Sequence, residues 1–118
     1  MYVREIMSGI EVQSRKKKFR EIYFITQGQV EMYDSSAVHF MNLPSGCIFG
    51  DYFVLFNLDS NIAFKVASNE ENIPAKFMAC DRKVVDELCA LYPQTAENLK
   101  QRSLEKRAIY LHYMLKAS

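Results

Sequence analysis

Cysteine, histidine and glycine are scarce in this chain of 118 residues, which contains three cysteines, two histidines and four glycines. Cys47, Cys80 and Cys89 form no CxxC pair, a pattern typical of small buried side chains in a reducing compartment rather than of a disulfide framework or a zinc site. His39 and His112 lie far apart without a carboxylate motif beside them, so their spacing predicts neither a metal site nor a catalytic triad. The phosphate-binding patterns GxxxxGKS/T and GxGxxG are also missing. We therefore expect neither an enzyme nor a bound cofactor.

Long apolar runs and an excess of one charge are missing as well. No stretch of about 18 apolar residues exists, so we expect no membrane insertion by this chain. The first residues, MYVREIMSGIEV, lack the basic-then-apolar order of a signal peptide. Lys and Arg number 15 and Asp and Glu number 14, which removes the global electrostatic argument for nucleic-acid binding. With 49% apolar and 25% charged residues, the composition is that of an ordinary globular domain.

Strand patterns fill the first two thirds of the chain. Short segments rich in β-branched and aromatic residues recur about every ten residues, with turn residues between them. The expected strands are 22–25, 30–33, 37–43, 62–66 and 73–79. This spacing predicts an antiparallel barrel, roll or sandwich.

The pattern becomes helical after Asp81, which is a good helix N-cap. Apolar residues repeat at helical spacing over 84–92, and Pro93 can end that helix and begin the next. A second, longer helix is predicted over 94–116. Its expected inward positions are Ala96, Leu99, Leu104, Ala108, Leu111 and Leu115.

The densest charge feature is the run Arg15-Lys16-Lys17-Lys18, followed by Arg20. One interpretation is a contact with phosphates or with an anionic membrane surface. The other is a solvated loop between two strands. A single short run in a near-neutral domain creates little electrostatic field, which favours the loop.

The segment Gly46–Asn57 has the residue types of a small binding site. A strand candidate runs into Phe49-Gly50-Asp51, and the apolar residues that follow can form one or two helical turns. Gly50 permits a ligand to approach the backbone closely, and the first N–H groups of the turn have no helical partners and can bind an anion. Asp51 could accept a hydrogen bond from a sugar hydroxyl. The same residues also fit a plain strand–turn–helix.

Three motifs resemble the cyclic-nucleotide-binding domain. Glu21-Ile22-Tyr23-Phe24-Ile25-Thr26-Gln27-Gly28-Gln29-Val30 is similar to the family's strand pair E-I/M-Y-F-I-x-x-G-x-V. Phe49-Gly50-Asp51 is similar to the F-G-E that opens its phosphate-binding cassette, and Leu91-Tyr92-Pro93 to the middle of its terminal helices. The resemblance covers about residues 8–115. It implies a jelly-roll-like antiparallel β-roll of about eight short strands, a short cassette helix and two C-terminal helices.

The resemblance also implies a domain organisation and a subfamily. We expect one domain over residues 1–118, with the roll at about 8–80 and the helices at about 81–116. The pattern Gly50-Asp51-Tyr52-x-x-Leu55-Phe56-Asn57-Leu58, with the break at Tyr92-Pro93, looks most like the cytosolic C-terminal domains of protist voltage-gated potassium channels.

The ligand implied by the resemblance is cAMP or cGMP. The implied binding residues are Phe49, Gly50, Asp51, Tyr52, Phe53, Ser60, Asn61 and Ile62. Ser60 stands where the family carries the arginine that pairs with the cyclic phosphate, and Asp51 is one methylene shorter than the usual Glu. A missing charge-assisted hydrogen bond of about 1.5–3 kcal/mol weakens binding by roughly one to two orders of magnitude. Alternatively, Tyr52 or Phe53 fills the pocket.

Three functions follow as hypotheses. The first is the cytosolic regulatory domain of a potassium channel that binds cAMP or cGMP weakly, with the rest of the membrane channel and neighbouring subunits as partners and no nucleic acid. The second is a ligand-free structural or assembly module of the same fold. The third is the sensor domain of a kinase regulatory subunit or transcription regulator. In this family the last helix is a lid, so Arg102, Lys106 and Arg107 are candidates for contacting a base or a neighbouring subunit.

Overall fold

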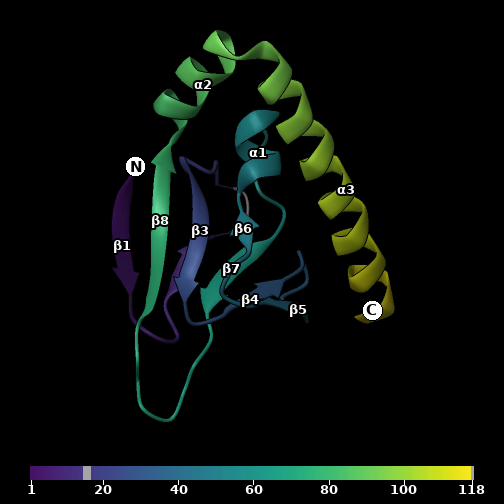
Figure 1. Cartoon of the computed structure of the whole chain (residues 1–118). Helices are drawn as coiled ribbons and strands as arrows, with labels where there is room; N and C mark the ends of the chain where they lie inside the picture. Colours follow the sequence, from purple (N-terminus) through teal and green to yellow (C-terminus); the bar gives the residue numbers. More distant parts are fainter. Residues whose placement is uncertain (15–16, 118) are drawn as a thin grey trace.

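The computed structural model describes residues 1–14 and 17–117, so Arg15 and Lys16 of the basic run lie outside the described residues. In this part of the chain, eight strands form two four-stranded antiparallel sheets, with one short helix within the roll and two helices after it (Figure 1). The first sheet has the order β1 (Tyr2–Ile6), β8 (Ala75–Asp81), β3 (Glu21–Gln27), β6 (Ile48–Phe49). The second has the order β2 (Glu11–Gln13), β7 (Ala63–Val66), β4 (Val30–Tyr33), β5 (His39–Leu43). The predicted antiparallel β-roll with C-terminal helices is confirmed.

The strand β3 shows how the sequence pattern directs side chains into the roll. Tyr23 and Ile25 are buried, whereas Phe24 between them is 40% exposed, as the two-residue period of a strand requires. Gly28 then takes φ +92°, where residues with a Cβ are disfavoured, and leads the chain into β4. The turn predicted at this glycine is therefore confirmed.

The first sheet begins earlier than the sequence indicated. The expected start of the roll was near residue 8, but β1 pairs with β8 from Tyr2 opposite Ala79 to Ile6 opposite Ala75. The strand was missed because it is an edge strand with two charged residues among its five, so its apolar alternation is weak.

Two other strand boundaries also differ. The strand expected from residue 37 begins at His39, because Ala37 has φ +63° and belongs to a turn. The strand expected from residue 73 begins at Ala75, after Pro74, which has no backbone donor for the sheet.

Aromatic rings fill the space between the two sheets. Phe19, Phe49, Phe64 and Phe77 are all fully buried or nearly so. The rings of Phe49 and Phe64 stack with centroids 5.0 Å apart, and Phe77 meets Phe49 edge-on at 5.8 Å. Such pairs stabilise a core beyond the apolar area they bury. The centre of the roll is therefore packed with protein side chains.

A short helix lies within the roll, and the two C-terminal helices begin and end within two residues of the predicted bounds. The helix α1 (Asp51–Leu55) follows β6, as the resemblance implied for a cassette helix. The side chain of Asp81 caps α2 (Arg82–Leu91) by accepting a hydrogen bond of 2.8 Å from the Lys83 N–H. The helix α3 (Pro93–Ala117) then descends past α1 towards β5 (Figure 1). No helix in the described part of the chain combines the length and apolar character needed to traverse a bilayer.

The predicted inward face of α3 is wrong at most positions. Ala96 is buried as expected, and the other buried residues of α3 are Ser103 and Tyr110, which follow it at seven-residue intervals. The helix α3 therefore contacts the roll along a single narrow line of residues, because the helix is long and the roll is small. The expected inward residues that are exposed instead are Leu99, Leu104, Ala108, Leu111 and Leu115.

Candidate ligand site at the cassette and the last helix

The packing of neighbouring residues requires a glycine at position 50. It precedes α1 with φ +86° and is buried. A Cβ atom at this position would lie 2.7 Å from Cδ1 of Phe19 and 3.0 Å from the backbone oxygen of Glu21. The close approach that glycine permits here is therefore to Phe19, not to open space for a ligand.

The space behind Gly50 is filled by aromatic rings. Phe19 is completely buried and stacks on Phe53, with centroids 5.3 Å apart and an interplanar angle of 4°. The edges of Phe49 and Phe64 complete the packing around Phe19. Phe49 and Phe53, both expected to line the ligand site, are thus residues of the core.

The carboxylate of Asp51 is occupied by a lysine from α3. Lys106 Nζ lies 2.6 Å from Asp51 Oδ2 and also donates a hydrogen bond of 3.1 Å to the backbone oxygen of Ile48. The side chain of Asp51 is 14% exposed and that of Lys106 is 32% exposed. Partial burial makes this pair stronger than an ordinary surface ion pair. It ties the start of α1 to the middle of α3.

Two further contacts hold α3 against α1. The guanidinium of Arg107 lies 4.6 Å from the ring centroid of Tyr52, within the range of a cation–π interaction. Tyr110, one turn of helix beyond Lys106, is buried. Burial raises the pKa of the Tyr110 hydroxyl, and the nearby Asp51 carboxylate and Cys47 raise it further, so the phenol stays neutral.

The end of the cassette is closed by hydrogen bonds to its own backbone. Ser60 is buried, and its hydroxyl donates to the Ile62 oxygen at 2.5 Å while accepting from the Ile62 N–H at 3.1 Å. Ile62 is also buried, whereas Asn61 is exposed. Because both hydrogen-bonding roles of the Ser60 hydroxyl are used within the loop, this side chain does not replace the missing arginine.

A groove of about 590 Å³ remains beside the cassette, between the β5 side of the roll and α3. The residues along it include Leu43, Cys47, Asp51, Arg102 and Lys106. Arg102 is exposed, so it is the cation on this part of α3 with the most freedom to meet an anion. Most of its other walls are apolar, from residues such as Met41, Ile48 and Ile109, and the carboxylate of Asp51 on its wall is already paired with Lys106.

The structure brings two of the expected site residues under the last helix and adds two roles that the sequence did not indicate. Asp51 and Tyr52 do lie under the last helix, and Lys106 and Arg107 are the side chains of α3 that contact them. The roles of Phe19 as the filler behind Gly50 and of Lys106 as the partner of Asp51 were not foreseen. A large apolar residue between Lys18 and Arg20 was the available signal for Phe19, since a solvated loop gives no reason for it.

No family model matches the sequence, and no curated protein matches it. Solved structures with the same fold are numerous. The catabolite activator protein of Thermus thermophilus superposes with a TM-score of 0.75 at 14% identity, over 98% of this chain and 53% of that protein. The CBD2 of PKAR bound to Sp-2Cl-cAMPS gives 0.74 at 14% identity, over 96% of this chain and 70% of that one. The regulatory domain of Toxoplasma gondii PKA with cAMP gives 0.72 at 12% identity, over 87% and 38%.

These similarities establish the fold. The chain has the architecture of a cyclic-nucleotide-binding domain, and it spans about half the length of the Thermus protein. Because the sequence identities are only 12–14%, the ligands named for the neighbouring structures are assigned to those proteins and not to this chain.

Proposed function

We propose that this chain is a non-enzymatic regulatory module whose cassette is held closed by its own last helix. The observation that carries the proposal is the 2.6 Å ion pair between Lys106 and Asp51. The resemblance assigns a ribose hydroxyl to this carboxylate, so a nucleotide and Lys106 compete for one acceptor. In this role Lys106 of α3 occupies the carboxylate that a ligand would bind. The domain then performs its regulatory or assembly task without a ligand.

Two other features support a closed cassette. The phosphate partner is missing at Ser60, whose hydroxyl is engaged with Ile62. Phe19 fills the interior behind Gly50, so the start of α1 has no space to move further into the roll. A ligand would have to open the Lys106–Asp51 pair without gaining the arginine contact of about 1.5–3 kcal/mol. Its apparent affinity equals the intrinsic affinity multiplied by the fraction of molecules in which the pair is open.

A second candidate function is weak binding of cAMP or cGMP. The groove of about 590 Å³ beside Asp51, with Arg102 at its edge, favours it. Binding there would displace Lys106 and move α3. The movement can act as a signal only if the ligand binds the open state better than the closed state.

The wider context is proposed from the sequence pattern alone. The residues 50–58 and the Tyr92-Pro93 break support a cytoplasmic domain of a potassium channel, with the rest of the channel and neighbouring subunits as partners and no nucleic acid. The same fold also suits the sensor domain of a kinase regulatory subunit or transcription regulator, as the similarity to PKA and catabolite activator structures indicates. In each case residues 1–118 act as a single domain.

Calorimetric titration with cAMP and cGMP to about 1 mM tests the closed cassette. We expect no heat of binding from the unmodified chain and little from Asn61→Arg, which places a cation at the exposed neighbour of Ser60, because the lysine still holds Asp51. Adding Lys106→Met to Asn61→Arg should produce measurable binding. Lys116→Met combined with Asn61→Arg is the control, because it removes the same charge from the exposed end of α3. Micromolar binding by the unmodified chain would reject the closed cassette and favour the second candidate.

A further inference from the structure

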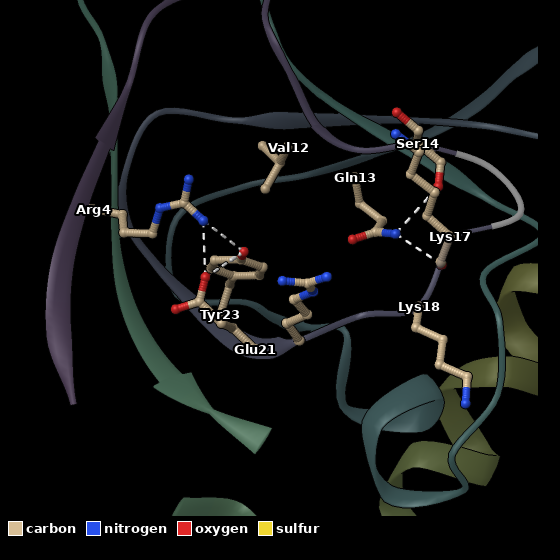
Figure 2. Close-up of a pocket in the computed structure, with 9 residues that line it drawn as sticks. Arg4, Val12, Gln13, Ser14, Lys17, Lys18, Glu21 and Tyr23 are labelled. Carbon is tan, nitrogen blue, oxygen red and sulfur yellow. Dashed lines mark hydrogen bonds and ion pairs between the residues drawn. The ribbon is translucent and has the colours of Figure 1, made fainter. Parts of the chain in front are cut away.

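A cavity of about 570 Å³ lies on a different part of the roll from the cassette groove, and the two share no lining residue. Its walls come from β1, from β2 with the residue that follows it, and from the segment 17–23 (Figure 2). Among the described residues, four cationic side chains and one carboxylate line it. The cations are Arg4, Lys17, Lys18 and Arg20, and the carboxylate is Glu21. The whole chain has a net charge of only +1, so positive charge is concentrated here.

The negative charge of Glu21 is neutralised within the cavity wall. Its carboxylate is 8% exposed, lies 2.8 Å from Arg4 Nη1 and accepts a hydrogen bond of 2.9 Å from the Tyr23 hydroxyl (Figure 2). Tyr2 donates a further hydrogen bond to it. Burial, followed by the contact with Glu21, raises the pKa of Tyr23, so this hydroxyl stays protonated and adds no charge. The wall thus fixes the guanidinium of Arg4 in place.

The basic segment is held by its backbone, which leaves its side chains free. The Lys17 oxygen accepts hydrogen bonds from Gln13 Nε2 at 2.9 Å and from the Ser60 N–H at 3.1 Å. Phe19 is buried in the core, and its oxygen accepts from Arg82 Nη2 at 2.9 Å. The backbone oxygen of the next residue accepts from the Arg82 N–H at 2.8 Å. These hydrogen bonds hold the backbone at residues 17, 19 and 20, so the points from which the cationic side chains extend are fixed.

The cations of this segment lack acidic partners. Lys17, Lys18 and Arg20 are exposed, and within residues 1–14 and 17–117 none of them forms an ion pair. The Lys18 side chain points away from Arg4 and Glu21, so it belongs to the outer rim (Figure 2). Cations held near one another without counter-charges repel, and a ligand with several negative charges relieves that repulsion at each contact.

We propose that this cavity binds a compact anion carrying two or more phosphate groups, either free or as the headgroup of a membrane lipid. Lys17 and Arg20 are the contacts to the phosphates, and Arg4, which is paired with Glu21, forms part of the wall beside them. The cavity volume falls within the range of about 300–1,000 Å³ that is typical of small-ligand sites and exceeds what a single phosphate needs. Guanidinium groups bind phosphate oxygens through two parallel hydrogen bonds, which suits Arg20, unpaired among the described residues, to this ligand.

Calorimetry with inositol 1,4,5-trisphosphate tests the site directly. We expect saturable binding that weakens as salt rises and that inorganic phosphate reproduces only at much higher concentration. The double variant Lys17→Gln/Arg20→Gln should weaken binding by at least about tenfold, since each charge-assisted contact contributes roughly that factor. The control Lys76→Gln/Lys116→Gln removes the same charge from exposed positions outside the cavity and should change affinity less than about twofold. Equal losses in both variants, or no binding by the unmodified chain, would overturn the proposal.

Vesicle sedimentation separates the two sources of the phosphate groups. Vesicles containing phosphatidylinositol 4,5-bisphosphate are compared with phosphatidylserine vesicles of equal surface charge. Binding to the bisphosphate vesicles that soluble trisphosphate competes away supports a lipid headgroup. Binding of the soluble compound without vesicle association supports a free ligand. Equal binding to both kinds of vesicle, not competed by trisphosphate, would show attraction by charge alone and would refute the site.

Discussion

Two surfaces of this small roll carry cations in contrasting ways. At the cassette, Lys106 of α3 lies 2.6 Å from the carboxylate of Asp51, and Arg107 covers the ring of Tyr52. In the basic cavity, Lys17 and Arg20 are exposed and form no ion pair within the described residues. A cation paired within the chain competes with an external ligand, whereas an unpaired cation on a fixed backbone attracts one. The contrast supports the two proposals, an external anion at the basic cavity and a cassette held closed by Lys106.

Phe19 links the two surfaces. Its ring packs behind Gly50 and against Phe53, while the residues on either side of it line the basic cavity. One buried side chain thus fills the interior next to the cassette and anchors the basic segment. A change that disturbs the packing of this ring should affect both surfaces.

The largest effect is expected from Gly50→Ala. The added Cβ would lie 2.7 Å from the Phe19 ring and 3.0 Å from a backbone oxygen, at a φ of +86°. We expect the free energy of unfolding to fall by about 3 kcal/mol, measured by urea denaturation. Gly46→Ala is the matched control, because Gly46 has φ +94° with no atom within 4 Å of the added Cβ, and it should cost about 1 kcal/mol. Equal losses would mean that Phe19 does not press on Gly50.

A smaller effect is expected when one lysine is removed from each surface. Lys106→Met breaks a partly buried ion pair and should lower the free energy of unfolding by about 1 kcal/mol. Lys17→Met removes an exposed side chain without an ionic partner among the described residues and should change stability by less than about 0.5 kcal/mol. Chemical denaturation of both variants at low salt measures the difference. A loss of stability in Lys17→Met as large as that in Lys106→Met would remove the contrast between the surfaces.

The smallest effect at neutral pH is expected from Tyr110→Phe. Burial and Asp51 raise the pKa of Tyr110 above that of an unfolded tyrosine, which is about 10. The neutral phenol is therefore favoured by folding, and its contribution to stability is present below pH 10 and lost as pH rises above it. Tyr110→Phe should reduce the loss of stability measured by urea denaturation above pH 10. Tyr92→Phe removes a hydroxyl from an exposed ring and is the matched control variant.

Local signals predicted most of the fold. Residues 30–33 form the predicted strand, and Asp81 caps α2 through its side chain, because both depend on near neighbours in sequence. The edge strand β1 and the inward face of α3 were not predictable in the same way. The strand β1 depends on pairing with β8, which is far away in sequence. The inward face of α3 depends partly on the ion pair with Asp51, so that Lys106 faces the roll while Leu115 is 77% exposed.

The candidate site was predicted only in part. The motif Phe49-Gly50-Asp51 located the start of α1 correctly, because glycine and a strand end are local features. What occupies the cassette depends on residues far away in sequence: Phe19 lies 31 positions before Gly50, and Lys106 lies 55 positions after Asp51. No spacing rule connects such residues, so the closed arrangement becomes visible only when the chain is folded.

Amide NMR signals of Gly50 and Asp51 during a titration with cAMP to about 1 mM test the closed cassette most directly. With Lys106 holding the carboxylate, these two signals should not move in the unmodified chain, and they should move in the Asn61→Arg/Lys106→Met variant. A saturable shift of either signal in the unmodified chain at micromolar cAMP would contradict the account.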